Sequence, residues 1–238
     1  MTTLDSDDTA RRGGPVQRGV IFDLDGTLAD TAGAITAITA GILTDMGREP
    51  DEAAIRATVG KPLDQNFAYL LGLPLDAEQV GEAMGLYRRR FGDHVRSEGR
   101  RLLFPGVAPG LLHLREVGRK LGVATSKVHA AAVKTVQITG IDDMFAAIAG
   151  HDSVARGKPH PDMALYVADR LGLAPEECVV VGDGLADIEM GLAAGMATIG
   201  VSYGVATAEE LVAAGAHTVV DSFCAVVDAV LAGVVIAA

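Results

Sequence analysis

The sequence predicts an α/β protein whose doubly wound parallel sheet carries an inserted, all-helical segment. After about residue 100, short and continuously apolar runs alternate with helical patterns. Such runs are typical of parallel strands that are buried on both faces, and the alternation is typical of strand–helix–strand units. From about Thr31 to Arg101 the alternation stops, and only helical patterns occur.

Six apolar runs are expected to form the strands of a Rossmann-like core sheet, the last of them as a short edge strand. They cover residues 20–22, 121–124, 146–149, 179–181, 197–199 and 219–220. The helical patterns between the later strands cover residues 128–139, 161–171, 187–194 and 208–214. Helices are therefore expected on both faces of the sheet.

The helical insertion begins directly after the first strand. Apolar residues at helical spacing predict its first helix, with Asp30 or Thr31 as the N-cap and Gly47 at the end. Further helical patterns cover residues 52–59, 63–71 and 77–91, and residues 103–107 are expected to return the chain to the core. This organisation predicts an α/β catalytic core of residues 18–30 and 102–238 and a helical cap of residues 31–101.

The composition is that of an ordinary globular protein with an excess of acidic residues. Hydrophobic residues make up 49% and charged residues 21% of the 238 positions, and the formal net charge is −11. This charge argues against nonspecific binding to nucleic acid or to an anionic membrane. A phosphorylated substrate is not excluded, because a metal ion and a few cations can dominate locally.

The cysteines and the two ends of the chain predict a cytoplasmic protein. Cys178 and Cys224 lack metal-ligand spacing, so no disulfide framework is expected and a reducing cytoplasm is the default. Residues 1–17 are rich in polar residues and glycine, and they are predicted to form a flexible tail rather than a secretory signal. The apolar run 226–238 is interrupted by Asp228 and Gly233, which favours a final packed helix over a membrane span. Neither a monomer nor a homodimer is favoured.

Residues capable of chemistry follow four of the predicted strands. Taken singly, each is an ordinary turn or loop residue. Ligands of an open parallel sheet bind outside the carboxyl ends of its strands, so these residues are expected to lie together. In chain order they are Asp23 and Asp25, Thr125 and Ser126, Lys158, and Asp183 with Asp187.

Four short motifs resemble those of the haloacid-dehalogenase-like superfamily in type and in order. They are Asp23-Leu-Asp25-Gly26-Thr27, the strand end at Thr125, Gly157-Lys158-Pro159, and Gly182-Asp183 followed by Asp187. The resemblance extends over residues 19 to about 222. The helical insertion looks like the small cap of the phosphoglycolate-phosphatase-like branch, and residues 203–204 and 209–216 are also similar to that branch.

The resemblance implies hydrolysis of a phosphate monoester. Asp23 would be the nucleophile that forms an aspartyl-phosphate intermediate. Asp25 would protonate the leaving alcohol and then activate water. Thr125 would donate a hydrogen bond to a phosphoryl oxygen, and Lys158 would neutralise charge between the phosphoryl group and Asp23.

The same resemblance implies Mg²⁺ as the cofactor. Asp23, the backbone carbonyl of Asp25, and Asp183 would bind the ion, because hard oxygen donors suit it. Asp187 would act through a water molecule or by holding the other ligands. The metal would offset the repulsion between an anionic nucleophile and the phosphate oxygens.

The substrate is expected to be a small phosphorylated metabolite, with phosphoglycolate as the leading candidate by resemblance alone. Lys61 in a cap loop and Ser126, where relatives often carry Asn, are candidate substrate contacts. An arginine of the basic stretch 88–101 could reach a substrate carboxylate. His160 is expected to hold the loop that carries Lys158.

Asp25 favours release of an alcohol, because dehalogenases and phosphonate-cleaving relatives lack an acid at this position. A sugar-phosphate mutase of the β-phosphoglucomutase type stays open, since it shares the same acid. A pyrophosphatase or a nucleotidase also stays open. A noncatalytic phosphometabolite-binding protein is disfavoured, because all the expected chemical groups are present.

Overall fold

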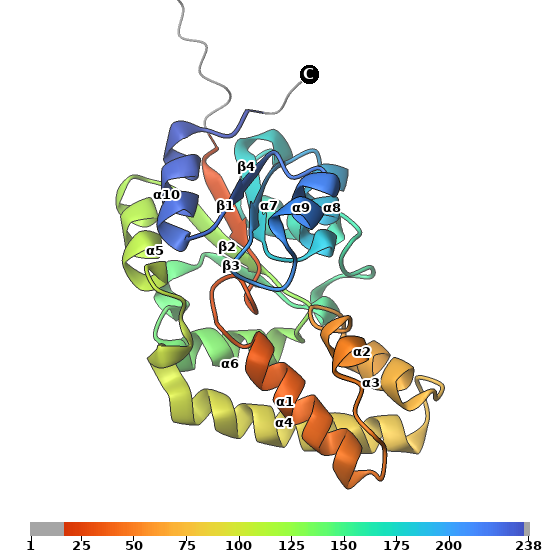
Figure 1. Ribbon diagram of the computed structural model, residues 1–238. Helices are drawn as coiled ribbons and strands as arrows, with labels where there is room; N and C mark the ends of the chain where they lie inside the picture. Colours follow the sequence, from red (N-terminus) through yellow and green to blue (C-terminus); the bar gives the residue numbers. More distant parts are fainter. Residues whose placement is uncertain (1–16, 236–238) are drawn as a thin grey trace, which may run out of the picture.

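The computed structural model describes residues 17–235, which fold into an α/β core and a helical insertion (Figure 1). The strands are β1 (Gly19–Phe22), β2 (Lys120–Ala124), β3 (Ala147–Ala149), β4 (Cys178–Gly182), β5 (Ala197–Val201) and β6 (Thr218–Val220). The insertion contains α1 (Ala32–Asp45), α2 (Glu52–Arg56), α3 (Leu63–Leu71) and α4 (Glu78–Glu98). The core contains α5 (Val107–Glu116), α6 (His129–Thr139), α7 (Asp162–Leu171), α8 (Leu185–Ala193), α9 (Ala208–Ala213) and α10 (Phe223–Ala232). Short 3₁₀ helices are η1 (Gly99–Leu102), η2 (Asp142–Met144), η3 (His151–Ser153) and η4 (Pro175–Glu177).

The six strands form one parallel sheet in the order β3-β2-β1-β4-β5-β6. The central strand β1 pairs with β2 on one side and with β4 on the other, so that Val20 lies opposite Leu121 and Val179. The strand order reverses between β1 and β4, which is the place where open α/β sheets bind ligands. The prediction of a doubly wound, Rossmann-like sheet is confirmed.

Helices cover both faces of the sheet, because successive strand residues point to opposite sides. In β1, Val20 and Phe22 join the apolar core formed with α5, α6 and α10, whereas Ile21 joins the core formed with α7 and α8. Figure 1 shows α5 and α10 on one side of the sheet and α7, α8 and α9 on the other. With both faces apolar and covered, the strand ends are where charged groups can gather.

The insertion α1–α4 has an apolar core of its own. Ile42 of α1, Phe67 of α3 and Phe91 of α4 are buried in it. The rings of Tyr87 and Phe91 stack with their centroids 5.3 Å apart. The insertion lies beyond the carboxyl ends of the strands, below the sheet in Figure 1.

Two chain crossings join the insertion to the core, and they run side by side. The backbone N–H of Asp30 donates to the carbonyl of Leu102 over 2.7 Å, and the N–H of Phe104 donates to the carbonyl of Leu28 over 3.1 Å. Both crossings therefore leave the sheet at one place, close to the residues that follow β1.

Helices α2, α4 and α5 differ from the predicted pattern. Helix α2, predicted to cover residues 52–59, ends at Arg56. The fourth insertion helix, predicted to end at residue 91, continues to Glu98 because Val95 is buried one turn after Phe91. Helix α5 has no counterpart among the predicted helices. Its buried residues Val107, Leu111 and Leu114 recur at helical spacing and pack against the sheet.

The ends of the described chain meet at Gln17 and Val234. The predicted tail of residues 1–17 lies outside the described residues except for Gln17, which is buried. The side chain of Gln17 donates to the carbonyl of Val234 and accepts from its N–H, each over 2.9 Å. The final helix predicted within residues 226–238 forms as α10, which ends at Ala232; residues 233–235 are not helical, and residues 236–238 lie outside the described part.

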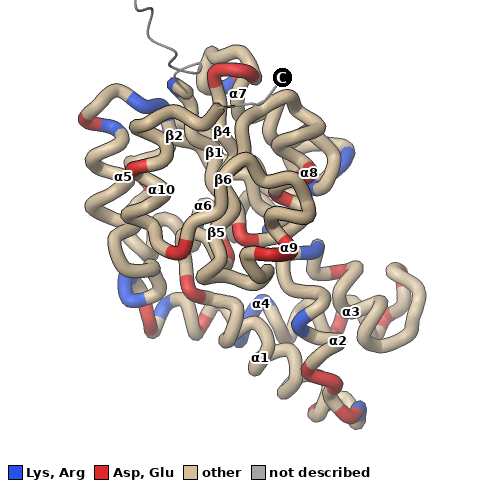
Figure 2. Tube along the Cα trace, turned by 45° about the horizontal axis from the view of Figure 1, so that its top comes forward, with Lys and Arg blue, Asp and Glu red and all other residues tan. Residues whose placement is uncertain are grey.

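The charged positions are spread over both the core and the insertion, with Lys and Arg interspersed among Asp and Glu (Figure 2). Within residues 17–235, none of the helices is both long and apolar enough to cross a membrane. Cys178 is buried and Cys224 is exposed, and both are free thiols.

Candidate active site

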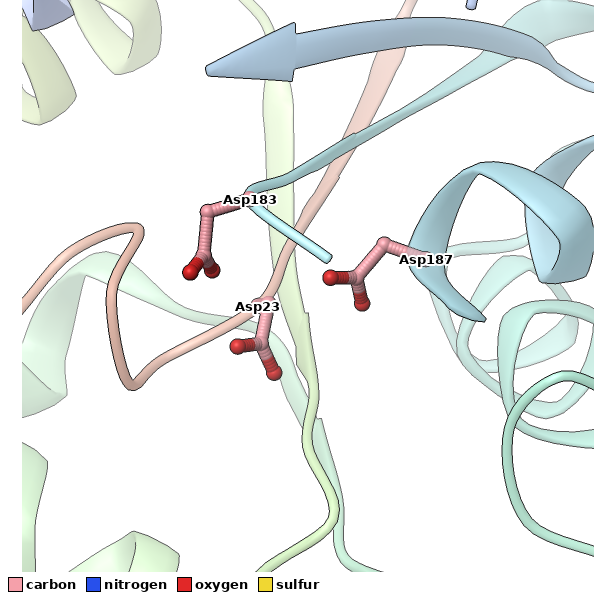
Figure 3. Close-up of side chains that lie close together, drawn as sticks. All are labelled: Asp23, Asp183 and Asp187. Atoms are coloured by element: carbon pink, nitrogen blue, oxygen red, sulfur yellow. The ribbon is translucent and has the colours of Figure 1, made fainter. Parts of the chain in front are cut away.

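Three buried aspartates converge where the strand order reverses (Figure 3). Asp23 directly follows β1, Asp183 directly follows β4, and Asp187 lies in the first turn of α8. Each of the three offers a carboxylate oxygen, and these oxygens lie within 4.8 Å of one another. The prediction that α8 would carry Asp187 in its first turn is confirmed.

Glycines leave the room that Asp183 and Asp187 occupy. A Cβ atom at Gly26 would lie 2.1 Å from Asp183 Oδ2, and one at Gly204 would lie 2.3 Å from Asp183 Cβ. A Cβ atom at Gly182 would lie 2.2 Å from Asp187 Cβ. Gly26 also has a φ of 83°, which favours glycine over any residue with a side chain.

Lys158 bridges two of the three aspartates. Its Nζ donates to Asp23 Oδ1 over 2.5 Å and lies 2.5 Å from Asp187 Oδ1. The side chains of Lys158 and Asp23 are only 4% and 8% exposed. Burial alone would lower the pKa of Lys158, but the charges of Asp187 and Asp23 outweigh burial and hold that pKa above its ordinary value. The lysine is therefore a fixed positive charge.

Both oxygens of Asp183 and one oxygen of Asp187 are held by neighbouring donors. The Thr27 hydroxyl donates to Asp183 Oδ1 over 2.8 Å, and the N–H of Val205 donates to Asp183 Oδ2 over 2.9 Å. The N–H of Gly184 donates to Asp187 Oδ2 over 3.0 Å. These bonds fix the carboxylates from the side of the core.

One lysine does not balance three carboxylates. Burial raises the pKa of Asp23 to about 8 against the opposing charge of Lys158, and Asp187 and Asp183 raise it further. Burial and the charge of Asp187 raise the pKa of Asp183 to about 7, although Thr27 and Val205 act in the opposite direction. A cation among the three would therefore favour their ionised forms.

Asp25 lies beside this cluster and is bound at both carboxylate oxygens. The Thr31 hydroxyl donates to Oδ1 over 2.6 Å, and Lys127 Nζ lies 2.7 Å from Oδ2. Thr31 occupies the predicted N-cap position of α1, but its side chain makes no capping bond. Its hydroxyl binds Asp25 instead.

A cavity of about 420 Å³ lies between the core and the insertion. Asp23 and Asp25 line it from the segment after β1, Thr125 and Ser126 from the segment after β2, and Lys61 from the insertion. Its walls are otherwise largely apolar, and further cations line it. The apolar residues include Ile35, Leu63, Met84, Phe91 and Ile138, and the further cations are Arg88, Arg96, Lys127 and Lys134.

Asp23 is therefore the residue at which the cavity meets the carboxylate cluster. The cavity, the cluster and the lysine that contacts the cluster together contain every residue predicted to act in catalysis, metal binding or substrate binding. His160 is exposed and its N–H donates to the carbonyl of Gly157 over 3.0 Å, so it braces the Lys158 loop through its backbone. Its imidazole does not line the cavity.

Comparison with known proteins agrees with this geometry. A family model described as "Haloacid dehalogenase-like hydrolase" matches residues 20–201. The chain belongs to the haloacid dehalogenase-like hydrolase family. Among curated relatives, "Probable phosphatase IndB" of Dickeya dadantii is 42% identical over 88% of this chain and 92% of its own length. "Phosphoglycolate phosphatase" of Salmonella typhimurium is 34% identical over 87% of this chain and 89% of its own length.

Solved structures share the fold of this haloacid dehalogenase-like hydrolase. A haloacid dehalogenase-like family hydrolase from Streptococcus pneumoniae is 25% identical, with a TM-score of 0.74 over 89% of this chain and 97% of its own. A β-phosphoglucomutase from Clostridium difficile is 23% identical, with a TM-score of 0.76 over 87% of this chain and 91% of its own. At this identity the second likeness concerns the fold alone.

The carboxylate cluster of this haloacid dehalogenase-like hydrolase fits a metal ion. Its donors are all oxygens, which suit a hard divalent cation. When all three carboxylates are ionised, the single positive charge of Lys158 leaves two negative charges unbalanced. Asp23, Asp183 and Asp187 are the residues that could hold the ion.

Several residues of the site escape prediction from the sequence, among them the following three. Lys127 contacts Asp25, Thr27 contacts Asp183, and the Tyr203 hydroxyl donates to the carbonyl of Thr27 over 2.9 Å. Thr27 and Tyr203 lie in segments that resemble the family. The signal for Lys127 is its position two residues after Thr125, at the same edge of the sheet.

Proposed function

We propose that the protein is a Mg²⁺-dependent phosphatase that hydrolyses a small phosphate monoester through an aspartyl-phosphate intermediate. The observation that carries this proposal is the position of Asp23. Its carboxylate faces a ligand-sized cavity, contacts the ammonium group of Lys158, and belongs to a three-carboxylate cluster suited to a cation. The same group can therefore meet a substrate phosphate and a metal ion.

The proposed reaction has two transfers. In the first, an Asp23 oxygen bonds to phosphorus, the bond from phosphorus to the alcohol oxygen breaks, and Asp25 gives that oxygen a proton. In the second, Asp25 takes a proton from water, the water oxygen bonds to phosphorus, and the bond to Asp23 breaks. Asp23 and Asp25 return to their starting forms, and one water molecule is consumed.

The remaining residues would bind the phosphoryl group and the metal ion and neutralise negative charge. Thr125 would donate a hydrogen bond to a phosphoryl oxygen, and Lys158 would oppose the charge that gathers between the phosphoryl group and Asp23. Asp23, Asp183 and the backbone carbonyl of Asp25 would hold Mg²⁺, with Asp187 acting through water or through the other ligands. When bound, the ion would offset the repulsion between the Asp23 carboxylate and the phosphate oxygens.

The insertion is proposed to act as a cap over this site. Its boundaries would be residues 31–101, with the core formed by residues 18–30 and 102–238, because the paired crossings at Asp30 and Leu102 could act as a hinge. Closure of such a cap excludes bulk water from the reacting groups. Ser126 and Lys61 line the cavity from opposite sides and are proposed as substrate contacts.

The substrate is proposed to be a small phosphorylated metabolite of the cytoplasm. Phosphoglycolate is the leading candidate because of the 34% identical Salmonella typhimurium relative. The cationic residues of the cavity could bind its carboxylate.

Release of phosphate from a panel of monoesters tests the proposal. The panel includes phosphoglycolate, hexose 1-phosphates, nucleotides and pyrophosphate, each with Mg²⁺ and with a chelator. Wild-type protein is expected to release phosphate only with Mg²⁺, and Asp23→Asn is expected to lose at least about a thousandfold of that activity. Asp169→Asn, an exposed change on α7, serves as the matched control.

Two outcomes would overturn the proposal in different ways. Equal turnover by wild type and Asp23→Asn would show that Asp23 is not the nucleophile. Isomerisation of a hexose 1-phosphate without stoichiometric phosphate release would instead identify a mutase.

A further inference from the structure

Lys127 connects the core of the site to the insertion through one side chain. Its Nζ lies 2.7 Å from Asp25 Oδ2 and 4.2 Å from the centroid of the Phe91 ring on α4. The side chain is only 13% exposed. One ammonium group therefore touches both the carboxylate that follows β1 and an aromatic ring of the insertion.

The backbone of Lys127 is also held. Its N–H donates to the Thr125 hydroxyl over 3.4 Å, and its carbonyl accepts from the N–H of His151 over 2.7 Å. These bonds tie Lys127 to the ends of β2 and β3. Its ammonium group is therefore delivered to Asp25 from a backbone that the sheet fixes.

Lys127 and Thr31 together determine where the Asp25 carboxylate points. Thr31 binds Oδ1 and Lys127 binds Oδ2, while Asp25 still lines the cavity. A proton-transferring group must lie within hydrogen-bond reach of the reacting oxygen. A displacement of about 1 Å can cost roughly a hundredfold in rate.

We propose that Lys127 is a positioning residue for Asp25, and that Phe91 lets the insertion control the place of Lys127. This inference rests on the proposed phosphatase function. Without the ammonium group, Oδ2 loses its partner and the carboxyl group can turn about its side-chain bond. The ring face of Phe91 attracts the ammonium group and, because α4 carries it, the contact depends on where the insertion lies.

The positioning role can be tested with leaving groups that differ in their need for a proton. In the first transfer, Asp25 gives its proton to the oxygen that leaves phosphorus. An aliphatic alkoxide needs that proton, whereas p-nitrophenolate is stable without it. A misplaced Asp25 therefore slows the transfer from an aliphatic ester and spares the transfer from p-nitrophenyl phosphate.

The experiment measures kcat/KM for glycerol 3-phosphate and for p-nitrophenyl phosphate, because kcat/KM reports the first transfer only. The ratio of the two kcat/KM values is then compared between variants. Lys127→Met is expected to lower the value for glycerol 3-phosphate about 100-fold and the value for p-nitrophenyl phosphate at most about threefold. Lys127→Arg, which keeps the charge, is expected to recover most of the loss. Lys120→Met is the matched control, because Lys120 also donates a hydrogen bond, to the Leu171 carbonyl, but at the far end of β2.

Two double variants test whether the effects pass through Lys127. Asp25→Asn is expected to shift the ratio of the two kcat/KM values in the same direction as Lys127→Met does. The double variant Asp25→Asn, Lys127→Met is expected to shift this ratio no further than Asp25→Asn alone. Phe91→Leu is expected to shift the ratio about threefold in the same direction, and to lose this effect when Lys127 is Met.

The outcomes separate this inference from the proposed function. Absence of phosphate release by wild type from both esters would overturn the proposed function, and the inference with it. An active wild type whose Lys127→Met variant loses both substrates equally, or neither, would overturn the inference alone. If Lys127→Met does not fold, Lys127→Gln, which removes the charge but keeps a polar side chain, takes its place in every comparison. An unchanged ratio in Phe91→Leu overturns the role of the insertion.

Discussion

The Thr27 hydroxyl donates a hydrogen bond to Asp183 Oδ1 over 2.8 Å, although the two residues stand 156 positions apart in the sequence. This contact joins the turn after β1 to the end of β4. It orients Asp183, a proposed Mg²⁺ ligand, without occupying the oxygen that Val205 binds.

Replacing Thr27 by Val is expected to weaken Mg²⁺ binding. Valine keeps the shape but removes the donor, and loss of a group that orients a metal ligand typically costs about 10–100-fold in affinity. We expect a higher Mg²⁺ concentration for half-maximal activity and nearly unchanged activity at saturating Mg²⁺. Calorimetric titration of Mn²⁺ into the protein without substrate measures the same change directly.

Thr39→Val is the control for this variant, because Thr39 is also buried but lies in α1 of the insertion. Equal Mg²⁺ requirements in wild type and Thr27→Val would contradict the orienting role. A matching loss in Thr39→Val would show a general effect of the buried Thr-to-Val change.

A side chain at Gly204 is expected to displace Asp183. The added Cβ would lie 2.3 Å from the Asp183 Cβ, closer than any real contact, so one of the two segments must move. Gly204→Ala should therefore lower the melting temperature and abolish the gain in melting temperature that we expect Mg²⁺ to give to wild type. Thermal unfolding with and without Mg²⁺ checks both effects.

The matched change is Gly81→Ala in α4, where an added Cβ meets no atom within 4 Å. Alanine in place of a helical glycine is expected to stabilise the protein by about 0.5–1 kcal/mol. A Gly204→Ala protein that gains as much melting temperature from Mg²⁺ as wild type would contradict the close packing of Gly204 against Asp183.

The cluster of aspartates was largely predictable from the sequence, and Lys127 was not. Asp23, Asp183 and Asp187 follow buried apolar strands, and the geometry of a parallel sheet brings adjacent strand ends together. The sequence predicts Asp30 or Thr31 as the N-cap of α1; Thr31 occupies that position, but its hydroxyl binds Asp25 instead of the helix backbone. Lys127 looks like an ordinary loop lysine, because its contact with Phe91 depends on how the insertion folds back over the sheet. Local patterns predict strand ends better than they predict contacts between separate parts.

The metal-free protein is expected to lose stability as the pH rises from about 4 to about 8. Burial raises the pKa of Asp23 to about 8 and that of Asp183 to about 7, so the folded state holds protons that the unfolded state has released near its ordinary value of 3.8. The free energy of unfolding falls with pH wherever the folded state binds more protons. This stabilisation is complete below the unfolded pKa and is lost as the pH passes the folded one.

Chemical denaturation in a chelator at about pH 5.5 and about pH 8.5 tests this dependence. Relative to wild type, Asp23→Asn should gain at least about 1 kcal/mol more at the higher pH, because it carries no charge to bury. Added Mg²⁺ should stabilise wild type more at the higher pH, since protons compete with the metal for the carboxylates. Parallel curves for wild type and Asp23→Asn would contradict the raised pKa of Asp23.

Two neighbouring arginines of α4 allow a test of how the cavity binds substrate. Arg88 lines the cavity, and Arg89 is not among the described residues that line it, although both are exposed. Arg88→Gln is expected to raise the KM for phosphoglycolate about three- to tenfold with little change in kcat, because an exposed ion pair contributes about 1 kcal/mol. The KM for glycerol 3-phosphate, which lacks the carboxylate, should stay within about twofold.

Arg89→Gln removes the same charge from the same helix, and it should leave both KM values near those of wild type. The comparison therefore separates a contact with the substrate from the general loss of positive charge on α4. Equal rises in KM for both substrates in Arg88→Gln would place this arginine near the phosphate rather than the carboxylate. Equal effects of the two variants would mean that the cavity attracts its substrate through long-range charge alone, and such attraction would weaken as salt is added.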